Sequence, residues 1–245
     1  MPPSDQPEQQ APPVQRLRVR YAKRGRMRFT SHRDFSRAFE RALVRARVPM
    51  AYSSGFNPHP RISYAGAAPT GAASEAEYLE IGLAERVDPV QLADALDEAL
   101  PDGLDVLEVV PSAGGALADR LEASVWRLTL RGEDPDALRT AVGDFLAAEE
   151  LLVQRMTKKG MRSFDARAAV IRLEVHELDQ DCAILELVLR HGTPSVRPDD
   201  VLAALREISG LSLGAALQQR LVQGPLDERG GTVDDPLAPD RDAEG

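Results

Sequence analysis

Residues 77–110, EYLEIGLAERVDPVQLADALDEALPDGLDVLEVV, decide the predicted fold because they indicate a strand, a helix and a strand in immediate succession. Residues 77–85 are typical of a strand, and Asp88 followed by Pro89 is typical of a helix start. After Gly103 the chain enters a further strand, LDVLEVV. Helical spacing places four apolar residues on the expected buried side of the helix: Val90, Ala93, Leu96 and Leu100.

The residues before this stretch complete a recognisable unit. Apolar residues alternate with arginines from residue 17 onward and again through Met27 and Phe29, which predicts an N-terminal strand. Ser31 and Asp34 have the spacing of a capping box, so a helix should follow to about Arg47. With a short strand at residues 62–65, the order is β-α-β-β-α-β, the split unit of a ferredoxin-like fold.

The second half of the chain repeats this order. Expected strands cover residues 124–132, 151–157, 182–190 and 216–223, and expected helices begin at Asp134 and Arg197; residues 163–176 resist assignment. We therefore predict an α+β protein with tandem ferredoxin-like halves, residues 16–112 and 118–224. The Pro- and Gln-rich residues 1–15 and the acidic residues 225–245 are expected to be disordered tails.

Composition excludes several classes of protein. Cys182 is the single cysteine among 245 residues, which excludes an internal disulfide and a cluster held by this chain's own cysteines. No apolar run reaches the ~18–20 residues that span a membrane, and the N-terminus lacks the apolar core of a signal peptide. We expect a cytoplasmic protein without a membrane contact or a cofactor.

The charge of the chain is unevenly distributed. The formal net charge is -9, yet residues 16–64 contain 13 Lys and Arg against two acids, a local charge of +11. The remainder therefore carries -20, and seven of its acids lie in residues 225–245. A basic segment of this density indicates a polyanionic partner.

The first helix concentrates this charge. Arg33, Arg37, Arg41 and Arg45 recur at i, i+4 spacing and so form one stripe, opposite an apolar face. Like charges at this spacing repel each other. We interpret the stripe as a surface for RNA or another polyanion. The alternative is a solvated helix face whose arginines pair with carboxylates elsewhere in the protein.

The loop GFNPHPR, residues 55–61, follows this helix and is stiffened by two prolines. Phe56 could stack on a base, and Asn57, His59 and Arg61 could donate hydrogen bonds to phosphates or base edges. A stiff loop loses little entropy on binding, as a recognition loop requires. The alternative is a structural bend with Phe56 buried.

His32 and His59 are candidates for general acid–base chemistry if the protein is an enzyme. No Cys or His spacing supports a metal site, and no P-loop, GxGxxG or GxSxG motif is present. In the second half, Lys158, Lys159 and Arg162 surround a glycine in a basic loop, which is either a further polyanion contact or an ordinary hairpin tip.

Three motifs resemble a bacterial family of uncharacterised, radical-SAM-linked proteins: Ser31-His32-x-Asp34, the loop at residues 55–60, and Ser74-Glu75-x-Glu77-Tyr78. The resemblance is strongest over residues 16–85. Arg33, where the family pattern has leucine, and the small residues 67–73 depart from it. The resemblance implies a radical-SAM enzyme as partner and, from neighbouring genes, a link to RNA or ribosomes.

These observations lead to three hypotheses. The first is a non-catalytic RNA-binding accessory protein of a radical-SAM enzyme, which would supply its own cluster. The second is an RNA-cleaving endonuclease that uses His32 or His59 as general acid and base, as RNA-processing endonucleases of CRISPR systems with tandem ferredoxin-like halves use a histidine. The third is a protein-interaction adaptor whose basic helix docks an acidic partner.

Overall fold

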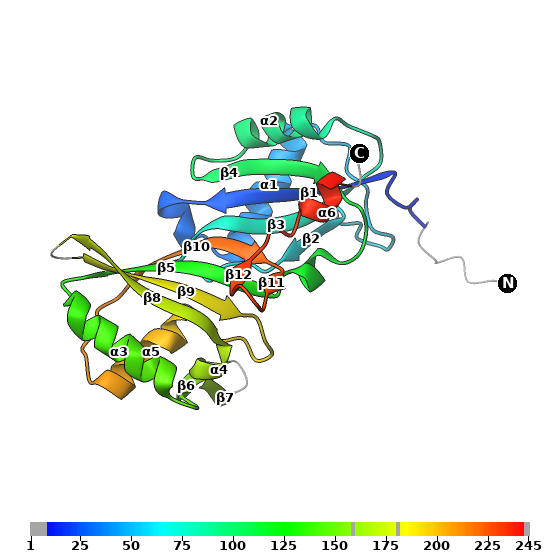
Figure 1. Cartoon of the computed structure of the whole chain (residues 1–245). Helices are drawn as coiled ribbons and strands as arrows, with labels where there is room; N and C mark the ends of the chain where they lie inside the picture. Colours follow the sequence, from blue (N-terminus) through cyan, green and yellow to red (C-terminus); the bar gives the residue numbers. More distant parts are fainter. Residues whose placement is uncertain (1–8, 158–159, 180–181, 243–245) are drawn as a thin grey trace. The chain divides into compact units, whose positions relative to one another are not determined.

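The structure, a computed structural model, describes residues 9–157, 160–179 and 182–242 (Figure 1). Two compact units make up the chain. Unit 1 comprises Met1–Ala118 and Leu237–Gly245, and unit 2 comprises Asp119–Pro236. The chain thus passes from unit 1 to unit 2 between Ala118 and Asp119, close to the boundary between the predicted halves, residues 16–112 and 118–224, and its C-terminal end returns to unit 1.

Unit 1 contains the predicted succession of strand, helix, two strands, helix and strand. Its elements are β1 (Gln15–Lys23), η1 (Gly25–Phe29), α1 (His32–Arg45), β2 (Ile62–Ala65), β3 (Ala73–Leu83), α2 (Pro89–Ala99) and β4 (Leu104–Pro111). Strand β1 pairs antiparallel with β3 and β4, and β2 pairs antiparallel with β3. The strand order is therefore β4-β1-β3-β2.

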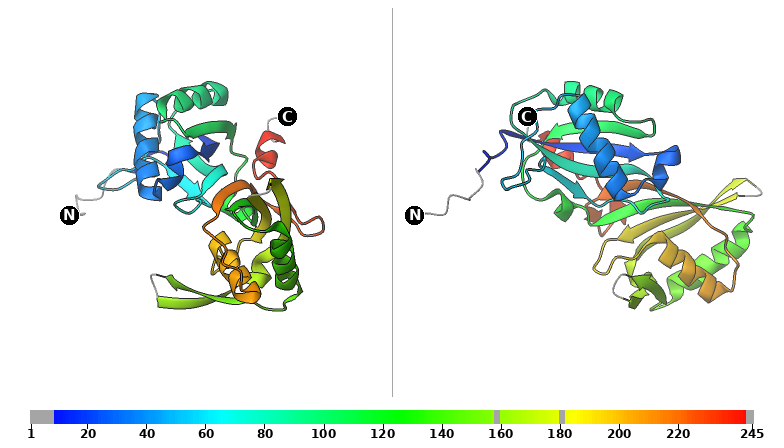
Figure 2. Two further views of the ribbon diagram at one scale, coloured as in Figure 1. Left: turned by 90° about the vertical axis from the view of Figure 1, so that its left-hand side faces the viewer. Right: turned by 180° about the vertical axis from the view of Figure 1, so that it is seen from behind.

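The core of unit 1 lies between this sheet and its helices. The alternation in β1 directs Leu17, Val19 and Tyr21 toward the helices, where α1 contributes Phe35 and Phe39. Figure 2 (left) shows α1 and α2 on one face of the sheet and the C-terminal helix on the other.

The predicted buried side of α2 is confirmed for Leu96 and Leu100, and Ala93 packs against the core, but the prediction is wrong for Val90, which is 69% exposed. A second local prediction in unit 1 is also wrong. Residues 25–29 form the 3-10 helix η1 rather than a continuation of the strand. Gly25 has a positive φ of 52° and ends the strand, and the amide of Met27 donates to the carbonyl of Arg24.

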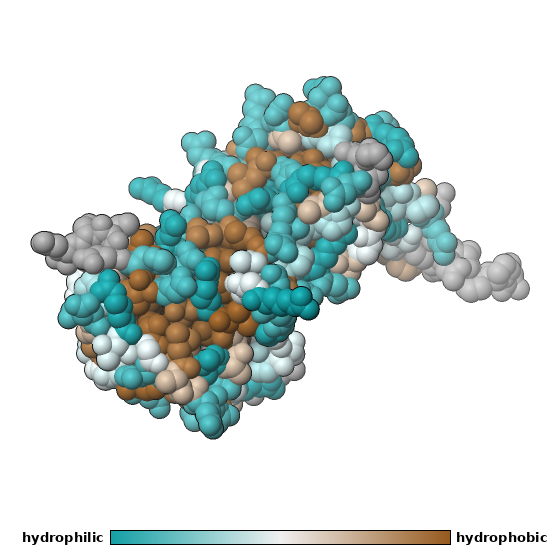
Figure 3. All heavy atoms as spheres, in the orientation of Figure 1, coloured by the Kyte–Doolittle hydropathy of each residue, from teal (hydrophilic) through white to brown (hydrophobic). Residues whose placement is uncertain are grey.

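Unit 2 contains a four-stranded antiparallel sheet in the order β10-β5-β9-β8. Its elements are β5 (Ala123–Arg131), α3 (Pro135–Ala147), β6 (Leu152–Thr157), β7 (Gly160–Asp165), α4 (Ala166–Ala169), β8 (Val170–Asp179), β9 (Cys182–Arg190), α5 (Pro198–Ser209) and β10 (Leu217–Gly224). The short η2 (Leu117–Arg120) spans the division between the units. Figure 3 shows apolar side chains gathered on the side of unit 2 where β8 lies.

The predicted strand at residues 151–157 is present, but it does not join this sheet as the ferredoxin-like order implied. It is β6, which pairs with β7 in a separate hairpin. The segment that resisted assignment, residues 163–176, contains the first part of β8 instead, the strand that pairs with β9 and buries Val170 and Leu173. Only Val153 of β6 is buried, so this strand has too little apolar surface to belong in the layered core.

The prediction of a disordered acidic tail is wrong for residues 225–242. They form β11 (Leu226–Asp227), β12 (Thr232–Val233) and α6 (Ala238–Asp242). Leu237 is fully buried, and Asp240 accepts two hydrogen bonds of 2.8 Å from the fully buried guanidinium of Arg18. This acidic segment is ordered by its buried contacts, those of Leu237 and Asp240, which composition alone does not reveal.

The predicted N-terminal tail has a different outcome. Residues 1–8 lie outside the described residues. The amide of Val14 donates to the carbonyl of Leu83 at 2.8 Å, and Gln15 begins β1, so the last part of the predicted tail is held by the sheet. Within the described part of the chain, no helix is long and apolar enough to cross a membrane.

Candidate nucleic-acid interface

Helix α1 is oriented by its cap and its apolar face. The hydroxyl of Ser31 accepts a hydrogen bond of 3.2 Å from the amide of Asp34, as the capping spacing predicted. The side chains of Phe35, Phe39 and Leu43 are buried against the sheet. The opposite face of α1 must therefore point away from the core, as Figure 2 (right) shows for the helix lying across the strands.

The arginine stripe (Arg33, Arg37, Arg41 and Arg45) lies on this outward face, and all four side chains are exposed. In the described part of the chain, no carboxylate lies within 4.0 Å of any of them. The guanidinium of Arg45 donates to the carbonyl of Ala99 at 3.0 Å. The alternative interpretation, in which internal carboxylates neutralise the stripe, therefore has no support in these contacts.

Much of the remaining positive charge of residues 16–64 is neutralised within unit 1. Arg16 and Arg18 donate to Glu80 at 3.0 and 3.1 Å, and Arg24 pairs with Glu75 and Asp105. The local excess of +11 thus overstates the charge that a ligand meets. The stripe contributes four of the exposed charges that remain, all on one face of α1.

The pKa of Glu80 reflects this pairing. Burial raises its pKa, but hydrogen bonds from Ser112, Arg16 and Arg18 outweigh burial and hold the pKa below the usual value. The pKa of Arg24 is raised, chiefly by its hydrogen bond to Glu75. Both groups are fixed in their charged forms as structural ion pairs.

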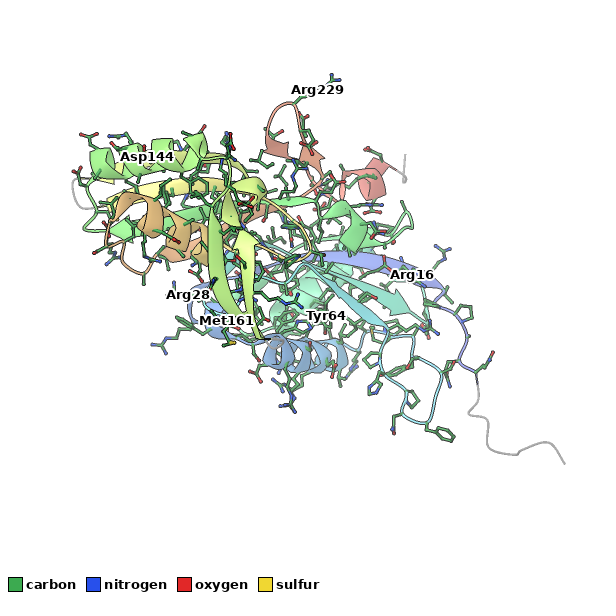
Figure 4. All side chains as sticks on the ribbon, turned by 90° about the horizontal axis from the view of Figure 1, so that it is seen from below. Arg16, Arg28, Tyr64, Asp144, Met161 and Arg229 are labelled. Carbon is green, nitrogen blue, oxygen red and sulfur yellow. The ribbon has the colours of Figure 1, made fainter. Side chains whose placement is uncertain are left out.

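The 3-10 helix η1 adds an aromatic and basic patch that the sequence interpretation missed by assigning it to a strand. Phe29 is 60% exposed, and the guanidinium of Arg28 lies 4.6 Å from the centre of its ring. Arg26 is exposed beside them. Figure 4 shows Arg28 at the end of unit 1 opposite Arg16. An exposed aromatic ring beside arginines is typical of surfaces that stack bases.

The predicted recognition loop is closed at its base by short contacts. The amide of Ser53 donates to the carbonyl of His59 at 2.9 Å, and the amide of His59 donates to the Ser53 hydroxyl at 3.0 Å. Gly55 adopts a φ of 135°, a backbone conformation that side chains disfavour. Phe56 is 77% exposed, and Asn57 and the side chain of His59 are also exposed. Phe56 is therefore not the buried anchor of a structural bend.

Arg61 differs from its neighbours in this loop. Its side chain is half-buried and donates to the carbonyl of Tyr52 at 3.0 Å, while its backbone bonds to Ala51 and Gly82. These contacts hold the base of the loop against β3. Arg61 thus supports the loop, and only the remaining donors of its guanidinium are left for a ligand.

His32 packs against an aromatic cluster. Its ring meets Tyr64 edge-on at 4.8 Å, and Tyr64 meets Phe35 edge-on at 5.9 Å. The Tyr64 hydroxyl is buried, with no hydrogen-bond partner within 3.5 Å in the described segments. Burial raises the pKa of this hydroxyl, and the nearby Ser36 only partly offsets that effect.

Below His32 lies a small polar cavity of about 20 Å³. Lys23 and Glu77 line it and are both buried, and they contact the carbonyl and the amide of Ala68 at 3.4 and 3.3 Å. Such a volume holds about one water molecule and no nucleotide. The Ser-His and Ser-Glu motifs therefore meet at the base of α1, where they position the helix.

His32 and His59 show no catalytic pairing. Within the described ranges, neither ring has a hydrogen bond to a side chain or a carboxylate within 4.0 Å. A general base needs a partner that orients its ring. The structure places His32 at the foot of α1 and His59 in the loop, in separate surroundings.

The basic loop of unit 2 is described in part. Lys158 and Lys159 lie outside the described residues. Arg162 is exposed on β7, opposite Arg155 in the hairpin register. Arg155 pairs with Asp200 and lies 4.2 Å from the ring of Phe164, so this arginine fastens the hairpin to unit 2.

One group of possible metal ligands is present in the part of the chain that the structure describes: Glu174, His176 and Glu186. Arg172 already lies between the two carboxylates, at 2.7 Å from Glu186 and 3.9 Å from Glu174. The spacing of these residues in the sequence does not indicate a metal site, because strand pairing brings them together. The guanidinium of Arg172 therefore supplies the positive charge that a metal ion would bring to these carboxylates.

Comparisons with known proteins add two findings. The family described as "Uncharacterized protein conserved in bacteria (DUF2344)" matches residues 16–198. No curated protein matches the chain in sequence. Among solved structures, a chain from a crystal structure of a Cbf5-Nop10-Gar1 complex is similar, with a TM-score of 0.50 and 10% identity. The match covers 89% of this chain and 56% of that chain, so it is a likeness of fold over little more than half of the solved chain.

Proposed function

The chain belongs to the bacterial family DUF2344, and from that premise we propose that it is a non-catalytic RNA-binding protein that partners a radical-SAM enzyme. The observation that carries this proposal is the exposed arginine stripe on α1, which has no carboxylate within 4.0 Å in the described residues. Side chains that repel one another without internal compensation are stabilised by an external polyanion.

The same proposal assigns each unit to the ferredoxin-like class. The antiparallel orders β4-β1-β3-β2 and β10-β5-β9-β8 support it, because each places the two central strands and the two helices in equivalent positions. In unit 2 the hairpin β6–β7 and the short α4 are then an insertion before β8. The fold alone assigns no function.

RNA would be bound by two kinds of contact in unit 1. The stripe holds phosphates through charge-assisted hydrogen bonds, which position a strand without reading its sequence. Phe56 and Phe29, both largely exposed, offer rings on which unpaired bases stack. The hydrogen bonds between Ser53 and His59 preorganise the loop and reduce the entropy lost on binding.

The radical-SAM partner follows from the resemblance of the motifs. This chain has a single cysteine, Cys182, and an iron–sulfur cluster takes about four cysteine ligands. The partner enzyme would therefore supply the cluster and the chemistry, and this chain would present the RNA. Modification of ribosomal or other cytoplasmic RNA is the process we assign to the pair.

The nuclease hypothesis has less support than the binding hypothesis. His32 packs edge-on against Tyr64, and the exposed ring of His59 has no orienting partner in the described residues. A ribonuclease site needs a base and an acid positioned around one phosphate. The adaptor hypothesis uses the same stripe, and the experiment below separates it from RNA binding.

The test is incubation of the full chain with labelled bacterial RNA, followed by measurement of retention and of fragment length. We expect retention without cleavage. Cleavage that disappears in His32→Ala or His59→Ala would favour the endonuclease. Failure to retain RNA would contradict the proposal and leave the adaptor hypothesis.

A further inference from the structure

One acid stands within the basic face of α1. Glu40 is exposed, three residues after Arg37 and directly before Arg41, and in the described residues its carboxylate has no ion pair within 4.0 Å. Together with Val44, these three residues line an open hollow on the helix. A carboxylate at this point repels phosphates. If this surface binds phosphates, the carboxylate must make a favourable contact of its own with the ligand.

The hollow lies between two rows of side chains. The arginine stripe is one row, and Ser36, Glu40 and Val44 form the neighbouring row at the same i, i+4 spacing. Successive members of a row are separated by about 6 Å along the helix, and rows run at about 26° to its axis. This step is close to the distance between neighbouring phosphates of an A-form strand. A strand that follows the stripe therefore places its sugars against the second row.

The members of the second row differ in what they can offer a sugar. The hydroxyl of Ser36 donates to the carbonyl of His32 at 2.9 Å and is used within the helix. Val44 is 77% exposed and offers an apolar contact for a ribose ring. Glu40 offers two carboxylate oxygens, which accept hydrogen bonds and donate none.

We propose that Glu40 accepts a hydrogen bond from the 2′-hydroxyl of an RNA strand whose flanking phosphates are held by Arg37 and Arg41. The inference rests on the proposed function and adds to it a preference for RNA over DNA. The 2′-hydroxyl is the group that distinguishes the two backbones. A DNA strand in the same position meets the repulsion of the carboxylate without the compensating hydrogen bond.

The test measures the affinity of the full chain for a short single-stranded RNA and for DNA of the same sequence. We expect the wild type to prefer RNA. In Glu40→Ala, RNA affinity should fall by about tenfold, the equivalent of one hydrogen bond to a charged group. DNA affinity should rise, because a repulsive charge has been removed. Alanine is a good helix former, so α1 should be retained.

Two further variants complete the experiment. Glu40→Gln keeps an acceptor oxygen and loses the charge, so it should preserve the preference for RNA while raising both affinities. Glu98→Ala removes an exposed acid from α2 and should leave the ratio of the two affinities unchanged.

An equal rise of both affinities in Glu40→Ala would overturn the inference and leave RNA binding intact. If neither nucleic acid binds the wild type and an acidic peptide does, both this inference and the proposed function are overturned.

Discussion

Replacement of Arg37, Arg41 and Arg45 by Gln tests the stripe directly. Each phosphate contact on a single strand contributes about 0.7 to the slope of log K against log salt, so three lost contacts should reduce the slope by about 2. Over a fourfold range of salt concentration, this difference changes the relative affinity by about 15-fold. The variant should therefore bind RNA weakly at low salt and show little further loss as salt rises.

The fold of α1 should survive this change. Gln and Arg have similar helix propensities, and removal of repulsion between i, i+4 neighbours stabilises a helix by a few tenths of a kcal/mol per pair. The melting temperature should stay constant or rise slightly. A matched control, with Arg127, Arg131 and Arg229 of unit 2 changed to Gln, removes the same charge from exposed positions.

The assay is fluorescence anisotropy of a labelled RNA over a salt series, with both variants and the wild type. The control should keep the wild-type slope. An unchanged slope and affinity in the α1 variant would refute the reasoning that these arginines contact phosphates. A slope reduced equally in the control would show that only the net charge of the protein matters.

The remaining predictions concern the loop, the ion pair that holds the C-terminal helix, and two half-buried side chains. Phe56→Ala should weaken RNA binding by about 1–3 kcal/mol with no loss of melting temperature, because the ring is exposed; a drop in stability of about 3–5 kcal/mol would show it to be a core residue instead. His59→Ala should cost on the order of 1–2 kcal/mol of RNA affinity, whereas a loss of RNA cleavage with affinity intact would identify an acid–base group. Asp240→Ala removes the carboxylate that pairs with the buried guanidinium of Arg18, and it should lower the free energy of unfolding of unit 1 by about 3–5 kcal/mol in denaturant titration. A change below about 1 kcal/mol would show that this ion pair does not hold α6 in place. Tyr64→Phe removes a buried hydroxyl without a partner in the described residues, so the melting temperature should hold or rise, and a fall would reveal a hydrogen bond. Burial lowers the pKa of His191 in the folded protein and so favours its neutral ring. The contribution of His191 to stability is therefore present above the unfolded pKa and is lost as the pH falls toward the folded pKa. His191→Gln should flatten the decline of stability below about pH 6.5, and an unchanged decline would assign that decline to other groups.

The parts of the fold that local signals specify could be predicted from the sequence. Ser31 and Asp34 marked the start of α1, and the spacing of the arginines placed them on one face, where they are exposed. Asp88 and Asp134 accept hydrogen bonds at the starts of α2 and α3, as their positions before prolines indicated.

The parts that depend on distant partners could not be predicted. Arg18 and Asp240 are 222 residues apart, and no local pattern links the acidic C-terminal segment to β1. The strand β8 was missed although polar and apolar residues alternate over residues 172–176, because the short α4 and a register shift directly after Val170 obscure where the strand begins. The contact between Arg28 and the exposed ring of Phe29 was missed because a 3-10 turn replaces the expected strand.

The proximity of the motif residues to one another could not be predicted from the sequence either. His32, Lys23 and Glu77 surround one small cavity because β1, α1 and β3 converge there, although they are up to 54 residues apart in the sequence. The cavity, of about 20 Å³, indicates a structural role in holding the base of α1.

Ultraviolet crosslinking of the full chain to RNA in bacterial cells, with the crosslinked peptides identified by mass spectrometry, tests the central claim most directly. The account predicts crosslinks within residues 25–61, which include η1, α1 and the loop that carries Phe56. A protein that recovers no RNA, or whose crosslinks lie only within residues 119–236, would contradict it.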